Sequence, residues 1–243
     1  MRDKNISRLE IMETKTVAIV PAYNEEYRIS TVLDVIHSSA FVDETIVVDD
    51  GSEDGTGQVA RRHPVTLLQW KENRGKGAAM QAGLDHAQGA KNVLFLDADL
   101  VNLCHEHIEA LLKPLEDPST AMSIGVFRAG NKNSVNLAQN YFSILNGQRA
   151  LNRAFVDMLP DLRWSRFGVE ILLTRFAALT QQKVVYPELH GITHVMKEEK
   201  LGYYRGFLYR LQMYRECLYA MFNYKKMIKN HPGNVPAYFL QRL

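Results

Sequence analysis

The feature that most constrains the fold is a regular alternation of short β-branched runs with longer segments of helical periodicity. Such alternation is typical of a mainly parallel sheet whose strands are joined by crossover helices. It predicts an α/β chain with a Rossmann-like sheet and helices on both faces. The expected strands cover 16–20, 45–49, 66–69, 92–97 and 121–126, and the expected helices cover 26–39, 55–62, 75–88 and 105–116.

Beyond residue 130 the pattern becomes more helical. We expect one long or two short helices over 133–157, a helix over 168–180, a returning strand over 183–188 and a long helix over 198–230. No linker-like, repetitive or low-complexity stretch divides the 243 residues. One domain over 1–243 is therefore expected, with a first part over 1–130, a second over 131–200 and a helical extension over 201–243.

Composition excludes several classes of protein. The net charge of +2 gives no reason to expect nucleic-acid binding, and two distant cysteines indicate a reducing compartment. The first fifteen residues are polar, so we expect no secretory signal. No apolar run approaches the roughly 18 residues that a membrane-spanning helix requires. These features predict a cytoplasmic protein that does not cross a membrane.

Four polar loops follow the predicted strands, over 21–26, 49–52, 73–77 and 97–99. In an open parallel sheet, ligands bind where the carboxyl ends of the strands meet and the loops diverge. All four loops are therefore expected at one edge of the sheet. This convergence is the strongest functional signal in the sequence.

The triplet Asp97-Ala98-Asp99 closes an apolar strand. Where the chain turns, both carboxylates can approach one point, and two hard oxygen donors beside a diphosphate suit Mg²⁺ or Mn²⁺. Such a cation would stabilise negative charge on a departing nucleotide. Alternatively, the triplet is an acidic turn that caps the helix near His105.

Two carboxylates, Asp49 and Asp50, end the second strand. They form either an acidic turn in which Ser52 or Asp54 caps the next helix, or a site for a donor such as a nucleobase N–H. In the third loop, Arg74 and Lys76 alternate with glycines and can neutralise phosphate charge. This loop lacks both the P-loop spacing and the dinucleotide GxGxxG pattern.

Together the four loops resemble the nucleotide-sugar site of family 2 glycosyltransferases, which have the GT-A fold. The match covers roughly the first 130 residues and is most similar to polyprenyl-phosphate sugar synthases and their soluble relatives. The resemblance implies that the base and ribose are surrounded by Pro21, Ala22, Tyr23 and Glu25. It implies that Asp49 meets the base with Asp50 beside it, and that Arg74 and Lys76 lie near the nucleotide.

The same resemblance implies that Asp97 and Asp99 flank the cation, with Asp99 as the stronger candidate for a direct ligand and Ala98 between them at the nucleotide. The family inverts configuration at the anomeric carbon, which implies direct in-line displacement. His194 lies where a histidine often completes the cation site in GT-A enzymes. The alternative for His194 is a surface position in a loop.

Two segments, 147–151 and 167–170, resemble the acceptor-side motifs of this group. Arg149 is expected either to hold an acceptor phosphate or to face solvent from a helix. Glu170, at a predicted helix start, is either a general base or a residue that favours the helix dipole. If the acceptor is a phosphate, its oxygen is already ionised and Glu170 orients rather than deprotonates.

The extension over 201–243 is basic and rich in aromatic residues that recur at three- and four-residue steps. It is expected to form an amphipathic helix over 201–230. Such a helix can lie on an anionic membrane surface, or pack on the domain or on a second copy of the chain.

The function expected from the resemblance is inverting, metal-assisted transfer of a hexose from a UDP- or GDP-sugar to a polyprenyl phosphate or another phosphorylated acceptor. That activity suits cell envelope biosynthesis at the inner face of a membrane. One alternative is nucleotidyl transfer to sugar phosphates, which usually needs a Gly-rich first loop that is absent here. Another is a receiver-like phosphoacceptor domain, in which the acidic pair would follow the first strand instead of the second.

Overall fold

The computed structural model describes residues 15–128, 146–194, 203–241 and 243. Its main sheet has the strand order β3-β2-β1-β4-β8-β6-β9. Strands β1 to β4 are parallel, and β8 runs antiparallel to both of its neighbours. The bounds are Thr16–Ala22 for β1, Glu44–Asp49 for β2, Thr66–Gln69 for β3, Asn92–Phe95 for β4, Thr120–Ile124 for β6, Arg149–Asn152 for β8 and Lys183–Val185 for β9.

Two small sheets extend the main one. In one of them β5 (Leu100–Val101) pairs with β11 (Thr193–His194), and in the other β7 (Val126–Arg128) pairs with β10 (Glu188–His190). The α-helices are α2 (Ile29–His37), α3 (Thr56–Ala60), α4 (Lys76–His86), α5 (His105–Leu112), α7 (Arg153–Val156), α8 (Val169–Leu179), α10 (Tyr203–Asn230) and α11 (Ala237–Leu240). Two 3₁₀ turns are η1 (Lys113–Glu116) and η3 (Arg166–Gly168).

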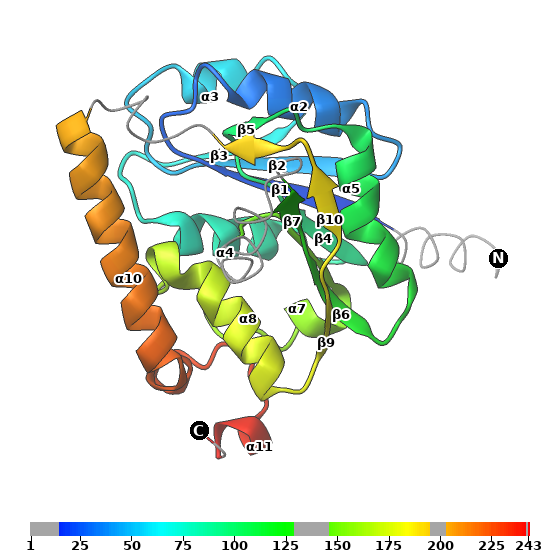
Figure 1. Ribbon diagram of the computed structural model, residues 1–243, viewed down its shortest axis with the longest axis vertical. Helices are drawn as coiled ribbons and strands as arrows, with labels where there is room; N and C mark the ends of the chain where they lie inside the picture. The colour runs from blue at the N-terminus through cyan, green and yellow to red at the C-terminus, as the bar shows by residue number, and fades with distance from the viewer. Residues whose placement is uncertain (1–14, 129–145, 195–202, 242) are drawn as a thin grey trace, which may run out of the picture.

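Helices cover both faces of the main sheet (Figure 1). Alternate residues of β1 point to opposite faces, as strand geometry requires. Val17 and Ile19 belong to the core under α4 and α8, whereas Ala18 and Val20 belong to the core under α2 and α5. The α/β prediction with a mainly parallel sheet is confirmed.

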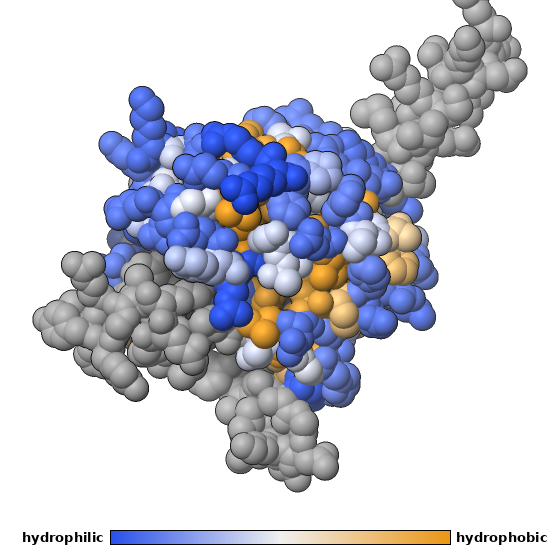
Figure 2. All heavy atoms as spheres, turned by 90° about the horizontal axis from the view of Figure 1, so that it is seen from above, coloured by the Kyte–Doolittle hydropathy of each residue, from blue (hydrophilic) through white to orange (hydrophobic). Residues whose placement is uncertain are grey.

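The absence of a side chain at Gly83 lets α4 lie close to the sheet. A Cβ atom added at Gly83 would lie 2.3 Å from Cγ2 of Ile19, which is closer than side chains pack. Because α4 begins at Lys76, within the third loop, its close packing on β1 fixes that loop against the strand ends. From the side of α2 and α3 the surface is largely hydrophilic, with apolar side chains gathered in a central area (Figure 2).

The structure corrects the helix expected over 133–157. Residues 133–145 lie outside the described part of the chain, but 149–152 form β8, which pairs with β4 and β6. Arg149, Ala150 and Leu151 are buried, so this strand lacks the apolar–polar alternation that marks a half-exposed strand. Pairing on both sides has overridden its local preference.

The remaining boundaries shift by a few residues. The strand expected over 183–188 consists instead of two strands, β9 and β10, which belong to different sheets. Tyr186 and Pro187 separate them. The helix expected over 198–230 is described from Tyr203 onward. None of the described helices combines the length and hydropathy that crossing a bilayer demands.

Candidate active site

A cavity of about 340 Å³ lies at the carboxyl ends of β1, β2 and β4. Most of the predicted site residues line it, namely Pro21, Ala22, Tyr23, Glu25, Asp50, Lys76, Asp97, Ala98, Asp99 and Glu170. The first, second, third and fourth polar loops therefore meet at one edge of the sheet, as the strand order predicts. Phe167, from the predicted acceptor-side segment, forms a further part of its wall together with Met213 and Cys217, for which no role was expected.

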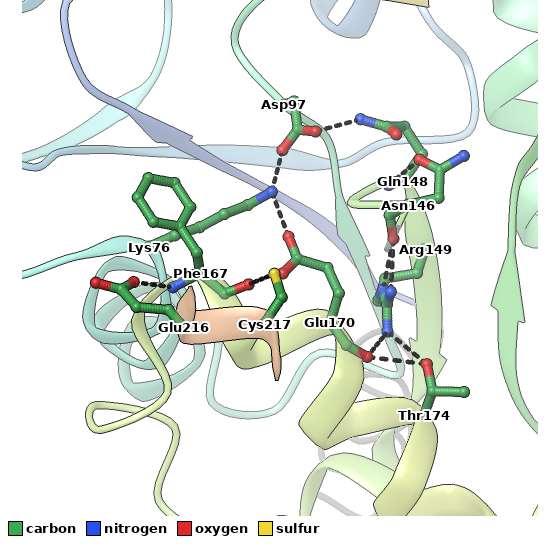
Figure 3. Close-up of polar contacts among 10 residues, drawn as sticks. All are labelled: Lys76, Asp97, Asn146, Gln148, Arg149, Phe167, Glu170, Thr174, Glu216 and Cys217. Atoms are coloured by element: carbon green, nitrogen blue, oxygen red, sulfur yellow. Dashed lines mark hydrogen bonds and ion pairs between the residues drawn. The ribbon is translucent and has the colours of Figure 1, made fainter. Parts of the chain in front are cut away.

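An ion-paired network crosses the cavity (Figure 3). The ammonium of Lys76 lies 2.5 Å from Oδ1 of Asp97 and 2.6 Å from Oε1 of Glu170. Burial lowers the pKa of Lys76, but the two carboxylates outweigh burial and leave this pKa above its usual value. Lys76 therefore holds together two carboxylates that would otherwise repel each other.

The backbone around this network leaves no spare room. A Cβ atom added at Gly147 would lie 2.5 Å from Oδ2 of Asp97 and 2.7 Å from Nζ of Lys76. Gln148 donates from Nε2 to the same Asp97 oxygen at 2.8 Å. Both oxygens of Asp97 are thus held by nitrogen donors, which restricts the part that Asp97 can play as a direct cation ligand.

Asp99 also lines the cavity, and β5 begins immediately after it. In β11 the backbone of His194 pairs with Leu100, the residue that follows Asp99, so these two predicted cation ligands lie close along the paired chains. The side chain of His194 lies outside the described part. Within the described side chains, no group of three or more His, Cys, Asp or Glu residues is arranged to hold a metal ion.

The donor set nevertheless fits a cation that is shared with a diphosphate. Mg²⁺ and Mn²⁺ in nucleotide sites take one or two carboxylates and complete their shell with phosphate and water oxygens. Asp99 supplies such a carboxylate, and the oxygens of Asp97 lie nearby in the same cavity. The alternative role of the triplet as a helix cap does not hold, because the residue at the N-cap of α5 is Cys104.

Asp49, the last residue of β2, and Asp50, which follows it, have different surroundings. Asp49 is fully buried and accepts from the backbone of Ser52 and, at 2.8 Å, from Nε2 of Gln69. It is not among the residues that line the cavity, and its contact with the base stays a prediction. Asp50 lines the cavity instead, and burial raises the pKa of its carboxyl, although backbone N–H groups of Arg74 and Gly75 oppose this.

The first loop is braced by the second. Asn24 adopts a left-handed backbone with φ of 57°, and its N–H donates to Oγ of Ser52. The N–H of Glu25 donates to Oγ1 of Thr56 at 2.7 Å. Burial, followed by the charge of Glu53, raises the pKa of Tyr23. These bonds hold Tyr23 and Glu25 at the cavity without a ligand.

Two basic residues that were predicted to contact the ligands, Arg74 and Arg149, do not line the cavity. The guanidinium of Arg74 stacks over the ring of Trp70, 4.8 Å from its centroid, and this residue is exposed beside the cavity. Arg149 is fully buried in β8 and donates to the carbonyls of Asn146 and Glu170 and to Oγ1 of Thr174.

This burial contradicts a solvent-facing helix position for Arg149, and its guanidinium does not face the cavity as an acceptor-phosphate ligand would. Burial lowers the pKa of Arg149 to about 10, which keeps it charged near neutral pH. Its donors support the loop before β8 and the first turn of α8. The acceptor-side role of segment 147–151 stays a prediction, and within it the Arg149 side chain bonds to backbone carbonyls of Asn146 and Glu170.

A larger hollow of about 690 Å³ lies near the far end of α4 and has a different character. Its charged residues are engaged with one another, since Arg163 pairs with Asp85 and Asp161, and Arg153 pairs with Asp157. No predicted site residue lines it. Size alone therefore does not identify the site in this molecule, whereas the convergence of the polar loops does.

Known proteins resemble the chain in both sequence and structure. A dolichyl-phosphate beta-glucosyltransferase of Trichomonas vaginalis is 42% identical over 101 residues, which cover 36% of this chain and 30% of the relative. The enzyme of that name from Drosophila melanogaster is 45% identical over 97 residues, covering 33% and 29% respectively. The matches thus span less than a third of the length of these curated relatives.

The solved structures that resemble this fold include glucosyl-3-phosphoglycerate synthase from Mycobacterium tuberculosis. In complex with Mn²⁺, UDP and glucosyl-3-phosphoglycerate, it has a TM-score of 0.69 at 22% identity and covers 95% of this chain and 85% of its own. In complex with Mn²⁺, UDP-glucose and phosphoglyceric acid, the TM-score is 0.68 at 25% identity, with 90% and 83% covered. These neighbours show the fold.

The family model described as "Glycosyl transferase family 2" matches residues 17–173. This range includes all four polar loops, β8 and the start of α8, and therefore both ends of the Lys76 network. The chain belongs to glycosyl transferase family 2.

Proposed function

We propose that the protein is an inverting glycosyltransferase that moves a hexose from a nucleotide-diphosphate sugar to a phosphorylated acceptor. One observation carries this proposal: four polar loops meet in one cavity, where Asp99 lies beside a charge network formed by Lys76, Asp97 and Glu170. The names of the relatives favour glucose as the sugar, and the UDP bound by the structural neighbour favours uracil as the base.

Some residues of the cavity would bind the base and ribose, and others would bind the diphosphate and its cation. Tyr23 and Asp50, which line the cavity from the first and second loops, would hold the base and ribose. Asp99, together with His194, would hold the Mg²⁺ or Mn²⁺ ion, and that ion would supply neutralisation of the diphosphate charge. Lys76 and Asp97 keep the centre of the cavity charged and rigid.

The transfer is a single displacement. An acceptor oxygen forms a bond to the anomeric carbon, while the bond from that carbon to the terminal phosphate oxygen breaks and the nucleoside diphosphate leaves with the electron pair. An acceptor phosphate needs no deprotonation, because its oxygen is ionised near pH 7. The pairing of Glu170 with Lys76 then suits orientation of the acceptor.

We favour a polyprenyl phosphate as the acceptor because the relatives with the higher identity are named for transfer to dolichyl phosphate. A soluble phosphorylated acceptor is the second candidate, because the structural neighbour was solved with phosphoglyceric acid. We further propose a role in cell envelope biosynthesis at the cytoplasmic face of a membrane. That location follows from the lipid-linked acceptor.

The test offers UDP-glucose, Mn²⁺ and either a short-chain polyprenyl phosphate or phosphoglyceric acid to the purified full chain. Transfer to the polyprenyl phosphate, with release of UDP, is the expected result. Glu170→Gln then distinguishes the two acceptor chemistries. A phosphate nucleophile predicts a modest loss of rate in this variant, whereas a hydroxyl nucleophile that needs a base predicts a loss on the order of 100-fold.

Two outcomes would reject the proposal. Release of pyrophosphate from a nucleoside triphosphate and a sugar phosphate would identify a nucleotidyltransferase. Absence of transfer to both acceptors, with UDP-glucose and GDP-mannose each tried as donor, would leave the glycosyltransferase assignment without support in activity.

A further inference from the structure

Helix α10 is fixed firmly to the body of the protein along one side. Cys217, Ala220 and Ile228 are buried on this inner side. A Cβ atom added at Gly168 would lie 2.5 Å from the Cβ of Ala220, so the helix lies very close to η3. Glu216 accepts from Nε of Arg166 and from the backbone N–H of Phe167. The opposite side is therefore held in a fixed orientation.

That opposite side exposes large apolar side chains. Between Leu211 and Lys229, the exposed apolar residues are Leu211, Tyr214, Leu218, Tyr219 and Phe222. Phe222 is 78% exposed and Leu218 is 54% exposed. Steps of three and four residues place Leu211, Tyr214, Leu218 and Phe222 on one helical face, because an α-helix turns once in 3.6 residues. Clustered apolar exposure of this kind marks an interaction surface.

The other exposed side chains that follow Leu211 on this helix, up to Lys229, are the four cations Arg215, Lys225, Lys226 and Lys229. On a helical projection they fall in the same half of the helix as the apolar set. The acidic residue of this segment, Glu216, points inward to Arg166 and Phe167. We call this combination of five apolar and four basic side chains the outer face of α10.

We propose that the outer face of α10 docks on an anionic lipid surface. Aromatic and aliphatic side chains enter the boundary between headgroups and acyl chains, while flanking Lys and Arg bind anionic headgroups. A second copy of the chain fits this face less well, because two such faces would bring cations together with no carboxylate between them. The charge of the face therefore selects lipid over self-association.

The position of α10 connects this surface with the cavity. Met213 and Cys217, on the inner side of the same helix, line the cavity beside Phe167. A membrane that meets the outer face would thus lie one helix away from the acceptor side. This connection rests on the proposed function, whereas docking itself does not, and docking is measured without substrate.

The experiment is co-sedimentation of the full chain with vesicles of phosphatidylcholine alone or with roughly one third phosphatidylglycerol, at low and high salt. We expect binding to the anionic vesicles that weakens with salt. Lys225→Glu with Lys226→Glu should reduce binding by about 25-fold or more, since each basic residue near such a surface is worth about fivefold. Leu218→Ser with Phe222→Ser should also reduce it, and this loss should persist at high salt.

Matched controls carry the same changes elsewhere on the surface. Lys91→Glu with Lys113→Glu reverses two exposed cations away from α10, and Tyr27→Ser removes an 87% exposed aromatic ring. Both should bind as the unmodified chain does. Circular dichroism should show a folded helix in every variant, because all the substituted side chains are exposed.

Failure of the unmodified chain to bind anionic vesicles would overturn the proposal, as would equal loss in the controls. Light scattering supplies a further arm. A dimer that Leu218→Ser with Phe222→Ser converts to a monomer, without any lipid binding, would assign the outer face to a second copy instead. UDP-glucose transfer to a water-soluble acceptor, measured alongside, separates a failure of docking from a failure of the proposed activity.

Discussion

The loops after β1, β2 and β4 form one wall of the cavity, and η3, α8 and α10 form the other. The first wall consists of short segments that are braced by backbone hydrogen bonds, such as those from Asn24 and Glu25 to the second loop and its helix. The second wall is assembled from segments far apart in sequence, and apolar packing holds Cys217 and Ala220 in place. Lys76 joins the two walls through Asp97 and Glu170.

This difference indicates which parts of the site a short sequence motif can predict. A loop that positions a ligand with its own backbone leaves a local signature, whereas a wall made by tertiary packing leaves only an apolar pattern. Substitutions in the link between the walls should therefore have larger effects than substitutions in the supports of either wall.

The largest effect is expected from Lys76→Met. Removing the cation leaves the carboxylates of Asp97 and Glu170 without its positive charge in a partly buried site, which should cost about 3 kcal/mol in the free energy of unfolding. Transfer activity should fall by roughly 100-fold because both walls lose their link. Denaturant titration and initial rates measure the two effects, with the exposed Lys71→Met as the matched control.

The ion pairs of Lys76 predict that the stability of the protein depends on pH. The carboxylates raise the folded-state pKa of Lys76 above its unfolded value, so the stabilisation is complete below about pH 10 and is lost as pH rises through the folded-state pKa. The stability difference between the unmodified chain and Lys76→Met should therefore be constant near neutral pH and shrink in alkali. A difference that instead grows with rising pH would contradict the ion-pair assignment.

Arg149→Met tests the support behind the second wall. The carbonyls of Asn146 and Glu170 would lose their buried donor, at a cost of about 2 kcal/mol in stability. The KM for the acceptor should change little relative to kcat if Arg149 acts as a support. A large, selective rise in acceptor KM with unchanged stability would restore the phosphate-binding role for this residue.

Gly147→Ala introduces a methyl group into the tight contact with Asp97 and Lys76. Both neighbours are the ends of side chains that can move, so the fold should survive with a loss of about 1 kcal/mol. Displacing the network should lower kcat by roughly 10-fold, since an error of about 1 Å in a site has effects of that order or more. Unchanged kcat would show that the network geometry does not limit the reaction.

Asp50→Asn and Asp49→Asn form the mildest and most specific comparison. Asp50 lines the cavity, so its variant should raise the donor KM by about 10-fold. Asp49 is buried behind it, so its variant should mainly lower stability, by about 1 kcal/mol. The reverse pattern, measured by donor titration and thermal unfolding, would place the base contact at Asp49 after all.

The sequence predicts the first wall of the cavity better than the second. The mainly parallel sheet and the meeting of the loops at one edge follow from strand and helix periodicity, whereas the individual residues of the first wall came from the family resemblance. The different surroundings of Asp49 and Asp50 were not predictable, because β2 ends at Asp49 and the sequence does not show in which direction the chain turns at Asp50.

Long-range packing explains the other errors. β8 was expected to be helical because pairing on both sides buries it and removes the alternation. The burial of Arg149 was hidden for the same reason. Met213 and Cys217 reach the cavity because Gly168 lets α10 lie close to η3. A single glycine in the sequence does not predict such a contact.

We propose that the cavity binds a nucleotide-diphosphate sugar through a cation held at Asp99. Calorimetric titration of UDP-glucose, with and without Mn²⁺, into the unmodified chain and Asp99→Asn tests it most directly. We predict tight binding that depends on Mn²⁺ and weakens by about 10-fold or more in the variant. Equal affinity in all four titrations, or Mn²⁺ dependence that survives in Asp99→Asn, would contradict the claim.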